Sequence, residues 1–359
     1  PVQLKEMMAH CLDIHNDGRD LEQLLSDCRE TLKYCVKTGH PHFLNQLSTG
    51  VDVVGVAGTW LAAAVNTNMF TYEAAPVFTL MEEVVLTRMR KLIGWADGEA
   101  MFAPGGAISN LYAVLLARYR RSPEVKTKGH DGSRLVVMTS EQSHFSITRA
   151  AAILGLGTDN VIYIRCHSNG KMDTADLREQ IATVQASGGD VILVNATCGS
   201  TVLGAYDPVS EMADICEQFG IWLHCDCAWG GGALLSRDYK HLVAGIHRYL
   251  RDQIKKRPGF HLLLEEIEAP NVCFWYLPPA WRSRPLEQVK DEHLHKVAPA
   301  LKARMMEAGS LMVQYQPLGR LPNLFRVAIS NPVLTRKDLD FLLDEMDHLG
   351  QDIPTPADW

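Results

Sequence analysis

The chain has 359 residues, of which 47% are hydrophobic and 21% are charged, and this composition excludes a disordered or fibrous protein. Its 35 basic and 42 acidic side chains give a net charge of −7, so nucleic acid is not expected as a partner, because phosphate binding requires a basic surface. The longest uncharged apolar run, residues 53–65, is too short for a membrane span, and the first residues do not resemble a signal peptide. Nine scattered cysteines without a regular framework predict free thiols and a cytoplasmic location.

Residues 1–45 are predicted to form an N-terminal helical segment. The apolar positions that recur there at helical spacing are Leu21, Leu24, Leu25, Cys28, Leu32 and Cys35. Residues 40–71, which overlap its end, are rich in Gly, Asn and Thr and also contain aromatic residues. Segments of this composition often line binding sites.

Residues 46–248 are predicted to form an α/β domain, with a parallel sheet between two layers of helices. Short apolar runs rich in β-branched residues predict strands that are buried on both faces, over residues 134–140, 160–165, 190–197 and 221–226. Helices are predicted over residues 77–93 and 108–120. A further helix is expected to begin with Asp207 as its N-cap and Pro208 in its first turn, and to end at Gly220.

Residues 249–359 have a different pattern, which predicts a smaller α+β domain at the C-terminus. Strands are expected over residues 271–278 and 324–330. Helices are expected over residues 249–256, 289–308 and 336–349.

A glycine turn at residues 105–110 precedes one of the predicted helices. Free backbone N–H groups, the helix dipole and the hydroxyl of Ser109 could together bind a phosphate there. A plain loop-to-helix turn explains the same residues equally well. The turn has neither the glycine pattern of dinucleotide-binding folds nor that of the P-loop, so it does not argue for NAD or ATP.

Three predicted strands end in residues that suit a ligand, and the carboxyl ends of parallel strands are where ligands bind. His144 follows the first strand and could stack on a flat cofactor or move a proton, although a structural histidine is the alternative. Thr197 ends the third strand among small residues. Asp226 ends the fourth, and a carboxylate at a buried position needs a cation, such as a protonated pyridine nitrogen. Together these residues and the glycine turn describe a pyridoxal phosphate (PLP) pocket.

Metal binding is the competing interpretation of the fourth strand end. Cys225 and Cys227 share a face of the strand and could in principle chelate an ion. The sequence has no second Cys or His pair at zinc spacing, so no metal site is predicted.

Ten segments, in the same order along residues 21–352, resemble the group II PLP-dependent amino acid decarboxylases. The resemblance is greatest to the branch that contains animal glutamate decarboxylase and cysteine sulfinate decarboxylase. The segments include HPHFLNQLSTG, NTNMFTYEAAPVF, APGGAISN, TSEQSHFSI, NATCGSTVLGAYDP, WLHCDCAWGGG, KVAPALKARMMEAGSLMVQYQP and NLFRVAISNP. The resemblance implies fold type I, the PLP-dependent transferase-like fold, with a three-layer large domain and a smaller α+β C-terminal domain. It also implies a homodimer that decarboxylates an acidic amino acid.

The resemblance also implies roles for individual residues. His144 would stack on one face of the PLP ring and Ala228 would pack against the other, while Asp226 pairs with the pyridine nitrogen and Thr197 lies near the ring hydroxyl. His144 and Asp226 are the implied catalytic residues. Gly106, Ala107 and Ser109 belong to the implied phosphate-binding turn, and Gln46, Leu47, Ser48 and Arg326 to the implied substrate site. The preferred substrate is L-glutamate, which would give 4-aminobutanoate, with cysteine sulfinate or aspartate as the alternative.

The chain departs from the family in two respects. Cys198, Ser200, Cys225 and Cys227 replace residues that are usually other small ones. In addition, the family continues after residue 248 into an Asn-Pro-His-Lys motif whose lysine forms the Schiff base with PLP, and this segment does not occur here. The pair His295-Lys296 matches a C-terminal helix instead, so no residue can be assigned as that lysine.

Two explanations of the missing segment are open. Either the sequence joins residues on both sides of a longer stretch of the protein, or the chain is a natural deletion variant. Loss of strands from the centre of a sheet would expose too much core for a folded domain, which favours the first explanation. A true deletion would instead indicate a relative without PLP that serves as a binding or regulatory subunit.

Overall fold

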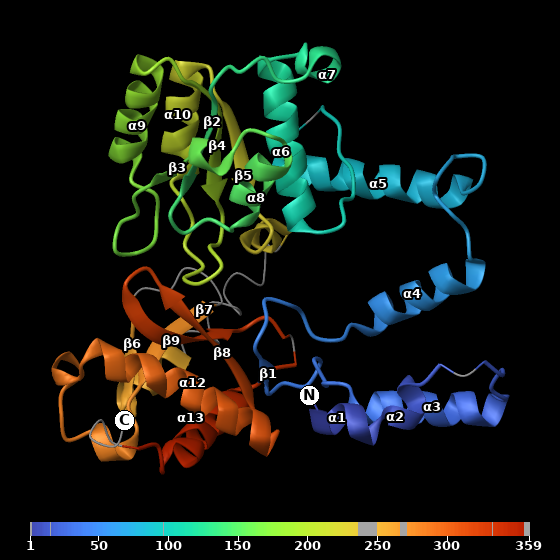
Figure 1. The fold of residues 1–359 in the computed structure, drawn as a ribbon, viewed down its shortest axis with the longest axis vertical. Coiled ribbons are helices and arrows are strands. Elements are labelled where there is room, and N and C mark those ends of the chain that lie inside the picture. The colour runs from blue at the N-terminus through green and yellow to red at the C-terminus, as the bar shows by residue number, and fades with distance from the viewer. Residues whose placement is uncertain are drawn as a thin grey trace.

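A computed structural model describes residues 2–14, 16–95, 97–235, 250–265, 271–331 and 333–354 (Figure 1). These residues form two β-sheets, each covered by helices, and a set of N-terminal helices beside them. No helix in these ranges is long and apolar enough to cross a membrane. The predicted junction at residues 248 and 249, where the family segment is missing, lies outside the described residues.

The first sheet is parallel, with the strand order β3-β2-β4-β5. Its strands are β2 (Leu135–Ser140), β3 (Val161–Ile164), β4 (Asp190–Thr197) and β5 (Trp222–Asp226). The prediction of strands buried on both faces is confirmed for the central strands β2 and β4. It is wrong for β3 and β5, which are partly exposed because each is an edge strand with a single neighbour in the described part of the chain.

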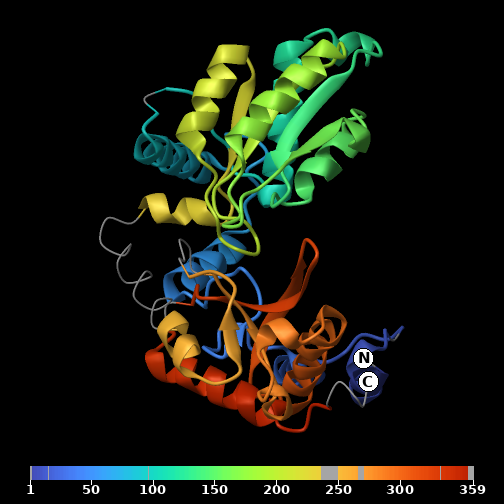
Figure 2. The same cartoon turned by 90° about the vertical axis from the view of Figure 1, so that its left-hand side faces the viewer.

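Helices cover both faces of this sheet, as Figure 2 shows, so the predicted three-layer architecture is confirmed. On one face, α6 (Gly106–Arg121) and α8 (Ser146–Ile153) bury Val114 and Ile147 against Val137 and Leu193. The other face is covered by α9 (Thr174–Ala186) and α10 (Val209–Phe219), which bury Leu177 and Met212 against Val136 and Val194. Three short helices, α7 (Val125–Lys128), η1 (Thr158–Asn160) and η2 (Gly230–Leu235), complete the unit.

The prediction that Asp207 caps α10 is wrong. The N-cap is Pro208, which offers no side-chain acceptor, and the helix ends at Gly220 as predicted. The buried Asp207 carboxylate instead accepts hydrogen bonds of 2.8 Å from the backbone N–H groups of Thr197 and Met172. Two buried backbone donors need an acceptor more than an exposed helix end does, and the carboxylate thereby fixes the end of β4.

The second sheet has the order β1-β8-β9-β7-β6. Its strands are β1 (Phe43–Leu44), β6 (Phe260–Leu262), β7 (Asn271–Tyr276), β8 (Met312–Leu318) and β9 (Leu321–Ala328). The predicted helices are present as α12 (Asp291–Ala308) and α13 (Arg336–Gly350), residues 250–256 are also helical, and η3 (Pro279–Trp281) and η4 (Leu286–Gln288) are single turns. The sequence did not predict β1, β6 or β8. The two-residue β1 pairs in parallel with β8, so a segment near the N-terminus completes the C-terminal sheet.

The N-terminal helices lie along one side of the two sheets (Figure 1). They are α1 (Val2–Met7), α2 (Ala9–Leu12), α3 (Leu21–Tyr34), α4 (Val53–Val65) and α5 (Pro76–Ile93). We call α3, α4 and α5 the N-terminal arm. None of its three helices buries a residue, although α4 and α5 are largely apolar on their exposed surfaces.

Candidate active site

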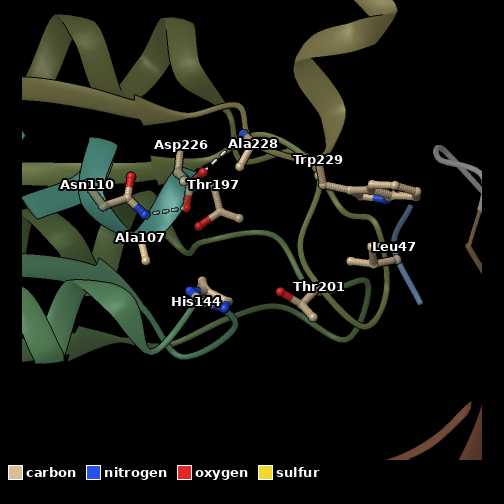
Figure 3. Close-up of a pocket in the computed structure, with 11 residues that line it drawn as sticks. Leu47, Ala107, Asn110, His144, Thr197, Thr201, Asp226, Ala228 and Trp229 are labelled. Carbon is tan, nitrogen blue, oxygen red and sulfur yellow. Dashed lines mark hydrogen bonds between the residues drawn. The ribbon is translucent and has the colours of Figure 1, made fainter. Parts of the chain in front are cut away.

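A pocket lies at the carboxyl ends of the parallel strands, where β2, β4 and β5 meet the start of α6 (Figure 3). The residues that line it are Leu47, Gly106, Ala107, Asn110, His144, Thr197, Gly199, Thr201, Asp226, Ala228 and Trp229. Seven of the residues selected from the sequence are therefore brought together. Gln46, Ser48, Ser109 and Arg326 are outside the lining.

Asp226 is the acidic residue of the pocket and is 8% exposed. One carboxylate oxygen accepts a hydrogen bond of 2.9 Å from the Asn110 amide, and the other accepts one of 3.1 Å from the backbone N–H of Ala228. Both donors are neutral, and no cation pairs with this carboxylate among the described residues. The pocket therefore presents a negative charge that can bind a protonated ring nitrogen.

Asn110 links Asp226 to His144 through the hydroxyl of Ser146. Its amide nitrogen donates to both Asp226 and the Ser146 hydroxyl, the latter at 2.9 Å, while its carbonyl oxygen is 2.8 Å from Nε2 of His224. The Ser146 hydroxyl in turn lies 2.8 Å from Nδ1 of His144. Burial holds the pKa of the His224 imidazole below its usual value, so His224 can be neutral and still donate to Asn110.

The tautomer of His144 follows from its contacts. Its Nδ1 atom also accepts from the backbone N–H of Ser146 at 3.2 Å, and a backbone N–H can only donate. Nδ1 is thus without a proton, and in the neutral ring the proton is on Nε2. Figure 3 shows His144 and Ala228 on opposite sides of the cavity that both residues line.

Thr197 provides a buried polar atom that has no partner. Its hydroxyl oxygen is inaccessible to solvent and makes no hydrogen bond, whereas its backbone N–H is held by Asp207. An unpaired buried hydroxyl is costly, so a ligand group is expected to form a hydrogen bond with it.

The glycine turn brings the backbone of α6 close to the opposite strand end. Gly105 is the N-cap with φ +94°, and no side chain caps the first turn. A Cβ atom on Gly106 would lie 3.0 Å from Cβ of Ala228. The bare first turn therefore faces the pocket, where its N–H groups and the helix dipole favour an anion. Ser109 is exposed, and its hydroxyl donates to the carbonyl of Gly105 at 3.3 Å.

Arg326 lies behind the pocket wall rather than in it. Its guanidinium donates to the carbonyl of Thr201 at 2.8 Å and to that of Asn45 at 3.2 Å, so it connects the two segments that carry Thr201 and Leu47. The side chain is 3% exposed, its Nε has no hydrogen-bond partner, and burial lowers its pKa. Gln46 and Ser48, the flanking residues of Leu47, are exposed.

Four lining residues have no role predicted from the sequence: Asn110, Gly199, Thr201 and Trp229. A signal for Asn110 was available, because Ala107, Asn110, Val114 and Ala117 recur at helical spacing on the face of α6 turned toward the sheet, and Asn is the polar exception. Gly199 has φ +93°, and a Cβ atom there would lie 2.8 Å from the backbone nitrogen of Gly230. That close approach depends on tertiary contacts that no local pattern reveals.

The polar groups of the pocket fit pyridoxal phosphate. Asp226 suits a protonated pyridine nitrogen, the unpaired hydroxyl of Thr197 suits a ring oxygen, and the uncapped start of α6 suits a phosphate. No group of three or more His, Cys, Asp or Glu side chains is placed to hold a metal ion in the described ranges.

Comparison with known proteins points in the same direction. The sequence model described as the pyridoxal-dependent decarboxylase conserved domain matches residues 1–249. The crystal structure of mouse CSAD is 37% identical with a TM-score of 0.94, and the match covers 98% of this chain and 92% of that chain. The same protein in its apo form matches with 37% identity, a TM-score of 0.94, and 98% and 93% coverage.

A bacterial structure shares the fold at lower identity. It is the glutamate decarboxylase domain of diaminobutyrate-pyruvate transaminase and L-2,4-diaminobutyrate decarboxylase from Vibrio parahaemolyticus. It is 22% identical with a TM-score of 0.86, and the match covers 98% of this chain and 89% of that chain.

Proposed function

The chain belongs to the pyridoxal-dependent decarboxylase family, and from this premise we propose that it removes the α-carboxylate of an acidic amino acid. It is a carboxy-lyase of fold type I with pyridoxal phosphate as its cofactor. When bound, the cofactor supplies an electron sink for the negative charge that remains after carbon dioxide leaves. The identity of the substrate and the roles of individual residues are the new parts of the proposal.

The residues of the pocket have distinct roles in this proposal. Asp226 holds a proton on the ring nitrogen and so maintains the electron sink. Asn110 and the Ala228 N–H keep its carboxylate in place, as their hydrogen bonds of 2.9 and 3.1 Å indicate. His144 lies against one ring face and Ala228 against the other.

The remaining cofactor contacts come from two segments. Thr197 donates its free hydroxyl to the ring oxygen. Gly106 and Ala107 offer backbone N–H groups to the phosphate, and Ser109 lies one turn further along the same helix.

The observation that carries the substrate proposal is a pair of neighbouring cations without an anion, Arg326 buried and Lys302 partly buried. Neither Arg326 nor Lys302 forms an ion pair in the described part of the chain. Lys302 donates to the side chain of Asn45 and to the carbonyl of Val313, and burial together with the charge of Arg326 lowers its pKa to about 8. A buried and a partly buried positive charge that lie close together are costly unless an anion joins them, and an acidic substrate brings one.

Two substrates compete within this class. The segments NQLSTG and NTNMFTYE favour L-glutamate. The similarity to mouse CSAD favours cysteine sulfinate. Both carry a second acidic group, so both can pair with Arg326 and Lys302. Values of kcat/KM measured with glutamate, cysteine sulfinate and aspartate on one preparation rank the substrates.

Arg326→Lys tests the acid-binding role, because it keeps the charge and loses the planar fork that binds a carboxylate through two nitrogens. We expect kcat/KM on the preferred acidic substrate to fall by about 2–3 kcal/mol. Cofactor affinity should change little, since Arg326 is outside the pocket lining. The matched control is Arg178→Lys, at an exposed arginine that bonds Gln218. Full kcat/KM of Arg326→Lys on both glutamate and cysteine sulfinate would refute the assignment.

A relative that lacks the cofactor is the second candidate, and one observation favours it: no lysine lines the pocket in the described residues. The family attaches its cofactor to a lysine in the segment that is missing after residue 248. Intact mass of the purified protein separates the two candidates. A mass well above that of the printed sequence supports the decarboxylase, and an equal mass together with no cofactor absorbance supports the binding subunit.

We also propose a cytoplasmic homodimer that forms through the N-terminal arm. Val54, Trp60, Val77 and Val84 are each at least 60% exposed, and such a surface is typical of an interface between subunits. All nine cysteines are free thiols, which suits a reducing compartment.

A further inference from the structure

Three cysteine side chains meet behind Asp226, on the sheet face that is turned away from the pocket. Asp226, the last residue of β5, points to the pocket, so Cys225 before it points the other way, and Cys227 just beyond the strand contacts Cys198 as Cys225 does. Cys225 packs against the core beneath α10. The thiol of Cys198, at the end of β4, is hydrogen-bonded to both of them.

Strand register determines which two of these thiols lie side by side. Thr197 is the register partner of Asp226, and the backbone N–H of Cys198 donates to the carbonyl of Asp226 at 2.9 Å. In a parallel ladder this bond places Cys198 beside Cys227, whereas Cys225 is a diagonal neighbour. Adjacent strands are about 4.8 Å apart, which is within the range of roughly 4.4–6.8 Å between Cα atoms that a disulfide needs.

A glycine turn fixes the backbones of these two cysteines. The N–H of Gly230 donates to the carbonyl of Cys198 at 3.0 Å, and the N–H of Gly231 donates to that of Cys227 at 2.8 Å. A Cβ atom on Gly231 would lie 2.9 Å from Cβ of Cys227. One turn therefore holds both cysteines, and their proximity does not depend on the orientation of flexible side chains.

We propose that Cys198 and Cys227 form a site of reversible oxidation, at which a hydroperoxide converts the two thiols into a disulfide and weakens the binding of pyridoxal phosphate. Cys227 is only partly buried and is the thiol that the oxidant reaches first, whereas Cys198 is 8% exposed. Cys225 is not a partner in the bond.

The chemistry balances with one hydroperoxide for each pair of thiols. The Cys227 sulfur attacks the peroxide oxygen, the O–O bond breaks, and a sulfenic acid and one water (or alcohol) form. The Cys198 sulfur then displaces hydroxide from the sulfenic acid, so that the S–S bond forms and a water leaves with the two remaining protons. Two electrons pass from the thiols to the peroxide, and a thiol reductant reverses the change.

The hydrogen bonds within the cluster support this order of events. The contacts with Cys225 and then Cys227 raise the pKa of Cys198, and they lower the pKa of both Cys225 and Cys227. Because the thiolate is the nucleophile, Cys198 is not the sulfur that reacts first, and the strand register leaves Cys227 as the reactive thiol beside it.

The link to the cofactor passes through two residues. Asp226 lies directly before Cys227, and Ala228 directly after it supplies the N–H that bonds Asp226 at 3.1 Å. When Cys227 is drawn toward Cys198, this N–H moves relative to the carboxylate, and both residues line the pocket. Loss of one hydrogen bond to a carboxylate corresponds to about tenfold weaker cofactor binding.

Peptide mapping tests the bond itself. The full protein with its cofactor is treated with hydrogen peroxide, alkylated, and digested without reductant by a protease that cleaves before aspartate. This cleavage places Cys198 in residues 190–206, Cys216 and Cys225 in residues 214–225, and Cys227 in residues 226–237. We expect a disulfide between the first and third peptides that dithiothreitol removes. A bond to residues 214–225, or no bond at all, overturns the proposal.

Variants and a binding measurement test its effect. Cys198→Ser and Cys227→Ser should abolish the bond, and the matched control Cys225→Ser should retain it. Equilibrium dialysis should show about tenfold weaker retention of pyridoxal phosphate after oxidation of the parent and of Cys225→Ser, and no change for the other two variants. Unchanged retention in a fully cross-linked parent overturns the effect on the cofactor. Mapping and dialysis need no amino acid substrate, so their outcome is independent of the acidic-substrate proposal.

Linkage provides a second check on the coupling. If oxidation weakens cofactor binding, a saturating cofactor must favour the dithiol by the same factor. In buffers of graded glutathione ratio, the cofactor-saturated protein should therefore need about tenfold more oxidising conditions to reach half oxidation. Identical midpoints with and without cofactor would contradict the coupling.

Discussion

The parallel sheet and the N-terminal arm are both rich in apolar residues, yet only the sheet buries them. Val194 in β4 is fully buried between two layers of helices, whereas Val84 in α5 is 68% exposed. The same residue type thus contributes to a core in one region and to an uncovered surface in the other. Apolar spacing predicts that a helix or strand forms, but the partner that covers it must be supplied by the rest of the chain or by another molecule.

The largest expected effect is a loss of activity that occurs on substitution in the parallel sheet and not in the N-terminal arm. Asp226→Asn should lower kcat/KM by about a thousandfold, because an amide carries no charge to keep the ring nitrogen protonated. Asp52→Asn in the arm is the matched control, since Asp52 only caps α4 by accepting from Gly55 at 2.7 Å, and asparagine caps equally well. Steady-state kinetics on the preferred acidic substrate measures both. Similar rates for the two variants would contradict the role of Asp226.

The next prediction compares the contribution of the two regions to stability. Leu193→Ala in β4 should reduce the free energy of unfolding by about 3 kcal/mol, since Leu193 is fully buried and the cavity cannot close. Leu80→Ala, at a half-exposed position of α5, should reduce the free energy of unfolding only while a second subunit covers the arm. Urea unfolding at several protein concentrations distinguishes them. The loss for Leu193→Ala should be independent of concentration, and the loss for Leu80→Ala should vanish on dilution.

A charge placed on the arm tests whether a second subunit covers it. Val84→Asp should weaken the homodimer by about 2 kcal/mol, because the carboxylate would be desolvated without a partner. Glu83→Asp on the same helix keeps its charge and should leave the assembly unchanged. Light scattering over a dilution series gives the dissociation constants. A parent protein that is monomeric and fully active at assay concentration would reject the dimer.

The smallest expected effect concerns pH and the two cations, Arg326 and Lys302. The pKa of Lys302 is lowered to about 8 by burial and by the charge of Arg326, so its charge is lost as pH rises through 8. KM for an acidic substrate should then increase about fivefold between pH 7 and pH 9, and Lys302→Met should remove this increase. A pH-independent KM in the parent would contradict a part for Lys302 in acid binding.

Lys302 should also change the pH dependence of stability. Between its folded pKa of about 8 and its ordinary value of 10.5, the unfolded chain binds more protons, so the Lys302 contribution to the free energy of unfolding rises with pH. Its burial penalty is largest below pH 8. The slope of stability against pH in that window should be smaller in Lys302→Met.

The fold could be predicted from the sequence where local pattern and tertiary environment agree. The strands β2 and β4 contain apolar runs and are buried along nearly their whole length because they are central, and α5, α6, α12 and α13 show helical spacing. The strand β1 could not be predicted, because it has two residues and is a strand only through its pairing with β8.

Some residues of the candidate site could likewise be predicted from the sequence, and others could not. His144, Thr197 and Asp226 follow apolar strands, so their place at one sheet edge could be derived from the sequence, and the structure brings them into one pocket. Asn110 is recognisable as the polar exception on the buried face of α6, but its role depends on three partners in two other elements, Ser146 in α8 and His224 and Asp226 in β5. Asp207 was assigned to the nearest helix because local rules do not include the distant donors that actually bind it.

The pairing of β1 with β8 affects when the pocket can form during synthesis. His42 contacts the carbonyl of Ser310 at 3.2 Å across 268 residues of sequence, and Leu47 in the pocket wall follows this junction by a few residues. Residues 43–44 leave the ribosome long before residues 312–318 exist, and contacts of such sequence separation form late in folding. Leu47 therefore reaches its position only after residues 312–318 have been translated. Cofactor loading is in consequence expected to follow the synthesis of β8, so the nascent enzyme stays inactive until this sheet is assembled.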